Sequence, residues 1–257
     1  GPQKEQQILQ DEGEMREEGA QTETENVSSG IEAETDSEAE EAVPPRANGR
    51  LVCIDAGHQI KGDSTPEPVA PGASETKARV SGGTTGRTTG VPEYQLTLEV
   101  ALKLRDELTA RGYEVVMTRE TNEVNISNSE RAGIARDAGA DIFVRLHANG
   151  SEDSSVNGAM TICQTAANPY TGGFYEQSKS LAQNILDSFC EATGAGKQYV
   201  WETDTMSGIN WSAVPVAILE MGYMTNPTED ANLCSADYQD KMVLGIANGI
   251  DAYFMQR

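Results

Sequence analysis

The segment LVCIDAGHQ, Leu51–Gln59, is the most informative about the architecture, because a continuous apolar run leads directly into a polar turn. Apolar runs of this length, bounded by turn residues, are typical of strands that are buried on both faces of a parallel sheet. The run ends at Asp55, and His58 follows as one of only two histidines in 257 residues. The stretch therefore predicts a buried strand with an imidazole just past its carboxyl end.

The rest of the chain alternates between helical and strand patterns. Residues 92–112 carry leucine and valine at helical spacing and end at Gly112, which favours a helix stop. Further strands are expected at 113–119, 141–149, 157–164 and 214–224, and further helices at 127–140, 175–192, 226–233 and 238–254. Strands separated by helices predict an α/β fold, a single domain with a mainly parallel twisted sheet and helices on both faces.

Two helix starts and two loops complete this assignment. Ser127 with Glu130, and Asn226 with Pro227 and Glu229, are capping signals for the helices that follow them. Residues 60–90, rich in Gly, Ser, Thr and Pro, are expected to form one long loop, and residues 202–210 a loop between strands.

Charge separates the chain into two parts. Residues 1–50 hold 14 Asp or Glu side chains against 4 Lys or Arg and few large apolar residues, within a net charge of −22 for the whole chain. Such a segment cannot bury enough surface to offset its ordering entropy. We expect residues 1–49 to be a disordered acidic tether, with an acidic helix at 5–18 as the alternative, and residues 50–257 to form the folded domain. The acidic total argues against nucleic acid as a partner, and no apolar run is long enough to span a bilayer.

Four side chains fall at one edge of the predicted sheet: His58, Glu93, His147 and Glu220. Ligands of open α/β sheets bind outside the carboxyl ends of the strands. Two histidines and a glutamate are a common ligand set of catalytic zinc, and a further carboxylate can act as general base. The pattern is consistent with one Zn²⁺ at this edge, although ordinary surface histidines and solvated glutamates remain the alternative on spacing alone.

Four blocks of the sequence resemble the type-3 family of zinc-dependent N-acetylmuramoyl-L-alanine amidases, which are bacterial cell-wall hydrolases. The blocks are IDAGHQ, PEYQLTLEVALKLRDELTARGYEVVMTR, SERAGIARDAGADIFVRLHAN and VPVAILEMGYMTNPTED, in this order between Arg50 and Phe254. The resemblance implies that residues 50–257 are a zinc amidase catalytic domain. It also implies that His58, Glu93 and His147 bind one Zn²⁺ and that Glu220 is the catalytic general base.

The same resemblance implies a substrate and a location. The expected reaction is hydrolysis, by a water held at the ion, of the amide between the lactyl group of N-acetylmuramic acid and L-alanine of the peptidoglycan stem peptide. We expect a monomer that acts outside the cell or in the cell envelope. The initial Gly-Pro is typical of a tag-cleavage scar, so a leader is expected to be missing from this sequence. A zinc peptidase acting on the stem peptide, or an inactive wall-binding module, are the alternatives.

Substrate contacts are less well defined by the sequence. Arg87 lies in the run TTGRTTG, Arg145 puts a charge where a small or apolar residue is expected, and Trp201 can offer an aromatic wall. Each also has an ordinary interpretation, as part of a solvated loop or of the core. Arg131 is expected to pair with a carboxylate, and the four cysteines match no zinc pattern.

Overall fold

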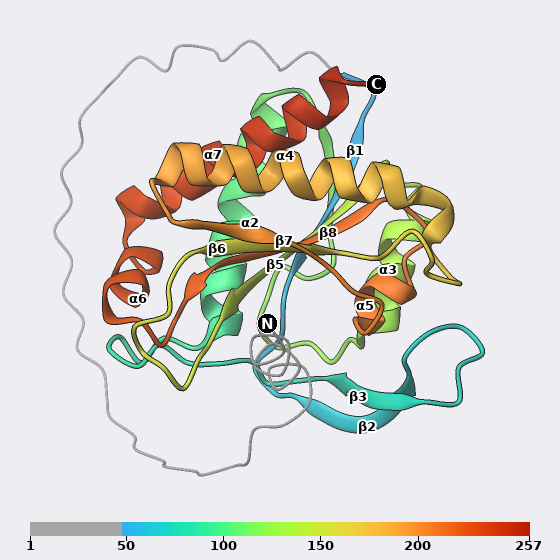
Figure 1. Cartoon of the computed structure of the whole chain (residues 1–257), viewed down its shortest axis with the longest axis horizontal. Coiled ribbons are helices and arrows are strands. Elements are labelled where there is room, and N and C mark those ends of the chain that lie inside the picture. The colour runs from blue at the N-terminus through green and yellow to red at the C-terminus, as the bar shows by residue number, and fades with distance from the viewer. Residues whose placement is uncertain (1–47) are drawn as a thin grey trace, which may run out of the picture.

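A six-stranded sheet runs through residues 48–257, the part of the chain that the computed structural model describes (Figure 1). The strand order is β4-β1-β5-β8-β6-β7. The strands are β1 (Leu51–Ala56), β4 (Glu114–Met117), β5 (Ile142–Asn149), β6 (Ala159–Cys163), β7 (Lys197–Glu202) and β8 (Val216–Tyr223). All neighbouring pairs are parallel except β6 and β8. The mainly parallel sheet is confirmed, whereas the acidic tether and the alternative helix lie outside the described residues.

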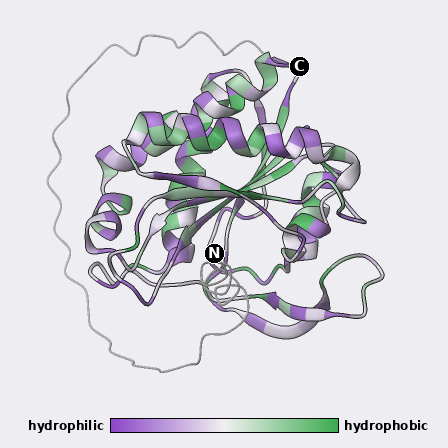
Figure 2. Cartoon of the chain, in the orientation of Figure 1, coloured by the Kyte–Doolittle hydropathy of each residue, from purple (hydrophilic) through white to green (hydrophobic). Residues whose placement is uncertain are grey.

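Helices cover both faces of the sheet, as predicted. The two layers are α2 (Glu93–Ala110), α4 (Tyr175–Thr193) and α7 (Ala236–Met255) on one face, and α3 (Asn128–Asp137) and α5 (Ser207–Asn210) on the other. The short η1 (Gly172–Phe174) precedes α4, and α6 (Pro227–Leu233) follows β8. Figure 2 shows hydrophobic residues concentrated in the central strands and mixed hydropathy along the helices. Burial of apolar side chains on both sides of the sheet explains why its strands carry near-continuous apolar runs.

The expectation of one long loop at residues 60–90 is wrong, because β2 (Asp63–Pro68) and β3 (Thr76–Val80) pair there as an antiparallel hairpin. Few hairpin side chains are buried, so the sequence lacks the alternation that marks a half-buried strand. Polar contacts hold the hairpin instead: Trp211 Nε1 donates to Pro68 O at 2.7 Å, and Ser129 Oγ donates to Glu67 at 2.7 Å. These contacts fix the hairpin against the α3–α5 side of the domain.

The predicted loop at residues 202–210 is also partly wrong, since α5 occupies its second half and the unpredicted strand β7 precedes it. The cap at Ser127 is confirmed as a full capping box with Glu130. Asn226 also caps its helix, but Glu229 does not complete a box. Its Oε1 instead accepts hydrogen bonds from the backbone N–H groups of Gly158, just before β6, and of Tyr223, at the end of the neighbouring strand β8.

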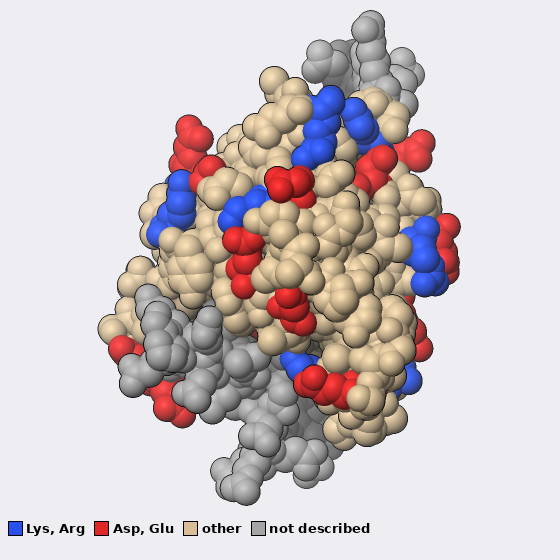
Figure 3. All heavy atoms as spheres, turned by 45° about the vertical axis from the view of Figure 1, so that its right-hand side comes forward, with Lys and Arg blue, Asp and Glu red and all other residues tan. Residues whose placement is uncertain are grey.

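Charges of both signs cover the described surface. On the face in Figure 3, Lys and Arg side chains lie near Asp and Glu side chains and do not merge into a basic surface. Pairs such as Arg105–Glu120 and Lys197–Asp187, at 2.9 and 2.6 Å, are largely exposed and contribute little to stability. Among the described helices, none has the length and hydropathy needed to cross a membrane. All four cysteines carry free thiols.

Candidate metal centre and active site

The imidazoles of His58 and His147 and the carboxylate of Glu93 converge on one point at the carboxyl edge of the sheet. His58 Nε2 lies 3.1 Å from Glu93 Oε1 and 3.2 Å from His147 Nδ1. His147 Nδ1 lies 3.3 Å from Glu93 Oε1. Two ligands bound tetrahedrally at zinc distances are about 3.3 Å apart, so the spacing fits a small divalent cation.

Hydrogen bonds on the far side of two of these groups fix which atoms face the point of convergence. His58 Nδ1 lies 2.9 Å from Ser81 O, and because a carbonyl only accepts, the ring donates there and leaves a lone pair on Nε2. Glu93 Oε1 accepts from Ala148 N and Oε2 accepts from Thr84 N, both at 2.9 Å. The arrangement gathers lone pairs at one place, where a metal ion can be held.

Burial and mutual charge shift the pKa values of this cluster. Burial raises the pKa of Glu93, but the two histidines outweigh it and hold the pKa of this carboxyl well below its usual range. Burial also lowers the pKa of His147, against the opposing effect of Glu93. Both shifts favour the protonation states that ligate a cation, an ionised carboxylate and a neutral imidazole.

Glu220 lies beside this cluster because of sheet register. It stands opposite His147 on the neighbouring parallel strand, so both side chains leave the same face of the sheet. Glu220 and the three converging residues line one pocket, which encloses about 30 Å³. This volume has room for one or two water-sized groups, so a large substrate must lie across the pocket mouth. The structure thus brings together all four residues that the sequence singled out.

The turn that carries the first histidine is tightly constrained. His58 has φ of 64°, the single positive value among described non-glycine residues, which is a costly backbone conformation. Gly57 comes directly before it, and a Cβ there would lie 2.6 Å from Leu146 O and also overlap the His147 ring. Gly57 is therefore needed for the close approach of β1 to β5.

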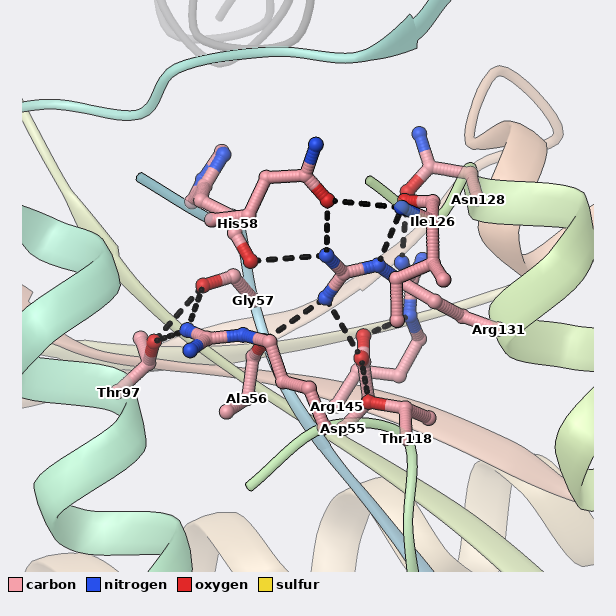
Figure 4. A network of polar contacts seen from close by, with 12 residues as sticks. Asp55, Ala56, Gly57, His58, Thr97, Thr118, Ile126, Asn128, Arg131 and Arg145 are labelled. Atoms are coloured by element: carbon pink, nitrogen blue, oxygen red, sulfur yellow. Dashed lines mark hydrogen bonds and ion pairs between the residues drawn. The ribbon is translucent and has the colours of Figure 1, made fainter. Parts of the chain in front are cut away.

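A buried ionic network lies behind this turn (Figure 4). Asp55 Oδ1 accepts from Arg131 Nη1 at 3.0 Å and from Thr118 Oγ1 at 2.6 Å, and Asp55 Oδ2 accepts from Arg145 Nε at 2.9 Å. Asp55, Arg131 and Arg145 are at most 1% exposed. Burial raises the pKa of Asp55, but the two guanidinium groups and the Thr118 hydroxyl outweigh it and keep this pKa below its usual range. Together with Arg119 we call Asp55, Arg131 and Arg145 the arginine cluster.

The arginine cluster holds the backbone that leads to the first histidine. Arg131 donates to Ala56 O and His58 O, both at 2.8 Å. Arg119 donates to Ala56 O at 2.8 Å and to Gly57 O at 3.1 Å. Burial and the neighbouring Arg131 lower the pKa of Arg119 to about 10. Three successive carbonyl groups are thus fixed by guanidinium donors, a role for Arg119 that sequence reasoning missed.

The three candidate substrate contacts lie in different environments. Arg145 is 1% exposed and is not among the residues that line the pocket. Trp201 is 8% exposed and packs in the hydrophobic core on the α3–α5 side. Arg87 is exposed, on a loop that Asp230 fixes by accepting hydrogen bonds from the two following N–H groups. Arg131 pairs with a buried carboxylate, as predicted.

Comparison with known proteins identifies the family of the chain. Residues 52–252 match the model of a protein family described as N-acetylmuramoyl-L-alanine amidase. The chain belongs to this family. The match covers the whole six-stranded sheet except the first residue of β1, and every residue of the candidate site.

Individual amidases give the extent of the likeness. The chain is 27% identical over 216 residues to the amidase Rv3717 of Mycobacterium tuberculosis, covering 82% of this chain and 89% of that protein. It is 31% identical over 168 residues to the amidase LytC of Bacillus subtilis, of which it spans 32%. The crystal structure of the amidase Ami1 from Mycobacterium abscessus superposes with a TM-score of 0.73 at 26% identity, covering 80% of this chain and 99% of that one.

Proposed function

We propose that this amidase hydrolyses the bond between the lactyl group of N-acetylmuramic acid and L-alanine in peptidoglycan, with one Zn²⁺ held by His58 Nε2, Glu93 Oε1 and His147 Nδ1. The observation that carries the proposal is the convergence of these atoms, from three separate segments, beside Glu220 in one pocket. The amidase names of the relatives support the choice of bond. Membership in a cell-wall amidase family implies action outside the cell or in its envelope.

The residues of the pocket have different roles in the proposed reaction. A bound Zn²⁺ supplies Lewis acidity that polarises the scissile carbonyl and lowers the pKa of water at the site. His58 is kept in the required tautomer by Ser81 O, and Glu93 is kept in place by two backbone N–H groups. Glu220 takes a proton from the attacking water and delivers it to the alanine nitrogen as the C–N bond breaks. The products are a lactyl carboxylate on the glycan and a peptide with a free amino end.

All proposed site residues come from one chain, so the site is complete in a single copy. This supports the proposal that the enzyme acts as a monomer. Neither the metal ligands nor the base require a second subunit.

Mass analysis of digested peptidoglycan tests the reaction. New amino termini should be L-alanine; new termini within the stem peptide would instead indicate a peptidase, and no new termini an inactive wall-binding module. Glu220→Gln should retain zinc and lose about 10²–10⁴-fold in rate, the usual size of an acid–base contribution. Glu191→Gln, an exposed glutamate on α4, is the control and should keep full rate. Retained turnover by Glu220→Gln would reject Glu220 as the base.

A further inference from the structure

Asn128, the first residue of α3, lies in the wall of the pocket that also contains His58, His147 and Glu220. Its Oδ1 accepts a hydrogen bond from Arg145 Nη2 at 2.9 Å. A guanidinium group has only donors, so the amide oxygen must face Arg145 and the NH₂ group must face away from it. The orientation of this carboxamide is therefore fixed by chemistry as well as by geometry.

The amide nitrogen of Asn128 has no hydrogen-bond partner in the part of the chain that the structure describes. Figure 4 shows this nitrogen pointing away from the arginine cluster, to the same side as the His58 imidazole. Since Asn128 lines the pocket, its two N–H donors are available to a molecule bound across the pocket mouth. Donors held in advance of binding cost little further ordering when a ligand accepts from them.

Arg145 is itself held rigidly. Its Nε donates to Asp55, its guanidinium carbon lies 5.6 Å from the centre of the Phe143 ring, and a Cβ on Gly208 would overlap its Nη1. Among the described residues, the buried Nη1 makes no hydrogen bond. A buried guanidinium with an unsatisfied nitrogen costs stability. The ion pair with Asp55 therefore does not satisfy the whole guanidinium group, and its Nη2 is the atom that orients Asn128.

We propose that Asn128 is a substrate-binding residue whose Nδ2 donates a hydrogen bond to a carbonyl oxygen of the muramoyl peptide beside the scissile amide, with Arg145 as the positioning residue behind it. The inference rests on the proposed function for the identity of the substrate. The muramoyl peptide offers neutral carbonyl oxygens near this bond, which a neutral carboxamide donor matches. The carboxamide of Asn128 also places N–H donors beside the proposed cation site without adding a positive charge there.

The isosteric variant Asn128→Asp tests the donor. The new carboxylate keeps its shape and its contact with Arg145, while its second oxygen presents an acceptor to the pocket. We measure the Kd of a soluble muropeptide with an intact muramoyl–alanine amide, using zinc-loaded Glu220→Gln protein so that the ligand survives. The variant should bind about 10–100-fold more weakly, as expected for an unpaired polar contact. Asn232→Asp, the same change at an exposed position of α6, should leave the Kd unchanged.

Asn128→Leu removes the donor without adding a charge, and it guards against a new carboxylate acting as a metal ligand. Zinc content and Tm are recorded for both variants to show that each is folded and loaded. The Leu variant should also bind about tenfold more weakly. Unchanged affinity in both variants, or no binding by the Glu220→Gln parent, would overturn the inference.

A double-mutant cycle tests the positioning role of Arg145. If Arg145 acts on binding only through Asn128, Arg145→Met should weaken binding as Asn128→Leu does, and the double variant should be no weaker than either single variant. If Arg145 has a purely structural role, Arg145→Met should lower Tm, and the Kd of the double variant should not level off at the value of the single variants. Losses of affinity that add in the double variant would reject the positioning role.

Digestion of peptidoglycan by the unaltered protein separates this inference from the proposed function. L-alanine termini together with normal muropeptide affinity in the Asn128 variants would keep the function and reject the role of Asn128. Muropeptide binding that depends on Asn128, without any L-alanine termini, would reject the proposed reaction and keep Asn128 as a binding residue.

Discussion

The ligand cluster of His58, Glu93 and His147 and the arginine cluster lie close together around β1 and β5, yet they have opposite chemistry. On β5, Arg145 and His147 are two residues apart and leave the same face of the sheet. The ligand cluster gathers lone pairs at one point. The arginine cluster combines three guanidinium groups with a single carboxylate, which pairs directly with Arg131 and Arg145, and all four side chains are at most 3% exposed. One region can hold a cation, and the other carries a positive charge of its own.

This difference indicates that, in this fold, one group of residues binds the metal and a separate group holds the metal ligands in place. Three positive charges with one negative charge cannot attract a cation, so the arginine cluster must be understood through what its N–H groups contact. Those groups fix the carbonyls of Ala56, Gly57 and His58. Groups behind a metal ligand commonly set its orientation and affinity. Changes in the two clusters should therefore affect different measured quantities.

The largest effect is expected from removal of a ligand. His58→Ala should lose bound zinc and with it all measurable hydrolysis, because Glu93 and His147 alone offer two of the three donor atoms. Metal analysis of the purified variant measures this directly. Ile60→Ala, at a neighbouring side chain that is 51% exposed, should keep one zinc per chain. A full equivalent of zinc in His58→Ala would remove this residue from the ligand set.

The next largest effect is expected in the arginine cluster. Arg131→Met leaves Asp55 with one guanidinium partner fewer and removes the hydrogen bonds from Arg131 to Ala56 O and His58 O. It should therefore lower the free energy of unfolding by about 3–5 kcal/mol. Chemical denaturation measures the change. Arg136→Met, which breaks an exposed pair with Asp137 on the same helix, should cost about 1 kcal/mol or less. Equal losses in the two variants would show that the buried network does not stabilise the fold.

The same comparison explains what the sequence could predict. The strand cores and the ends of β1, β5 and β8 were predictable, because apolar runs mark buried parallel strands and parallel strands present their carboxyl ends at one edge. The positions of His147 and Glu220 could be predicted on this basis, since each lies in the carboxyl-terminal half of its strand. The family resemblance then supplied the roles that spacing alone left open.

The missed features depend on contacts between segments far apart in the chain. Hairpin β2–β3 is held by polar contacts to α3 and to Trp211, so its own sequence carries no burial pattern. The role of Arg119 gives no local signal, because its contacts with the carbonyls of Gly57 and Ala56 span 62 and 63 positions. Asn128 is seen as a pocket donor only once Arg145 is known to hold its oxygen.

A smaller effect is expected where the two clusters meet. Gly57→Ala places a Cβ against the His147 ring and 2.6 Å from Leu146 O, so backbone or ring must shift. Overpacking of this kind costs about 1–3 kcal/mol. The shift of His147 should also weaken zinc affinity, measured by competition with a chelator. Gly82→Ala, near the site but with open space around it, should change neither quantity. Wild-type affinity and stability in Gly57→Ala would show that this approach is not constrained.

The smallest effect is expected in how the free energy of unfolding depends on pH in acid, and its sign follows from the pKa of Asp55. The pKa of this carboxyl is lowered in the folded state, because the two guanidinium groups outweigh its burial. The unfolded chain therefore binds a proton at about pH 3.9 while the folded protein does not, so this stabilisation is present above about pH 4 and is lost below it. The limiting slope is about 1.4 kcal/mol per pH unit.

Asp55→Asn should therefore be less stable at neutral pH but lose less stability between pH 4 and pH 2 than the unaltered protein, compared in the same metal state. Denaturation curves across this range give the two slopes. Glu152→Gln, which removes an exposed carboxylate, controls for the loss of one acidic group. Parallel curves of stability against pH for Asp55→Asn and the unaltered protein would mean that Asp55 has the same pKa in the folded and unfolded states. The arginine cluster would then hold the turn before His58 through hydrogen bonds to its carbonyls alone.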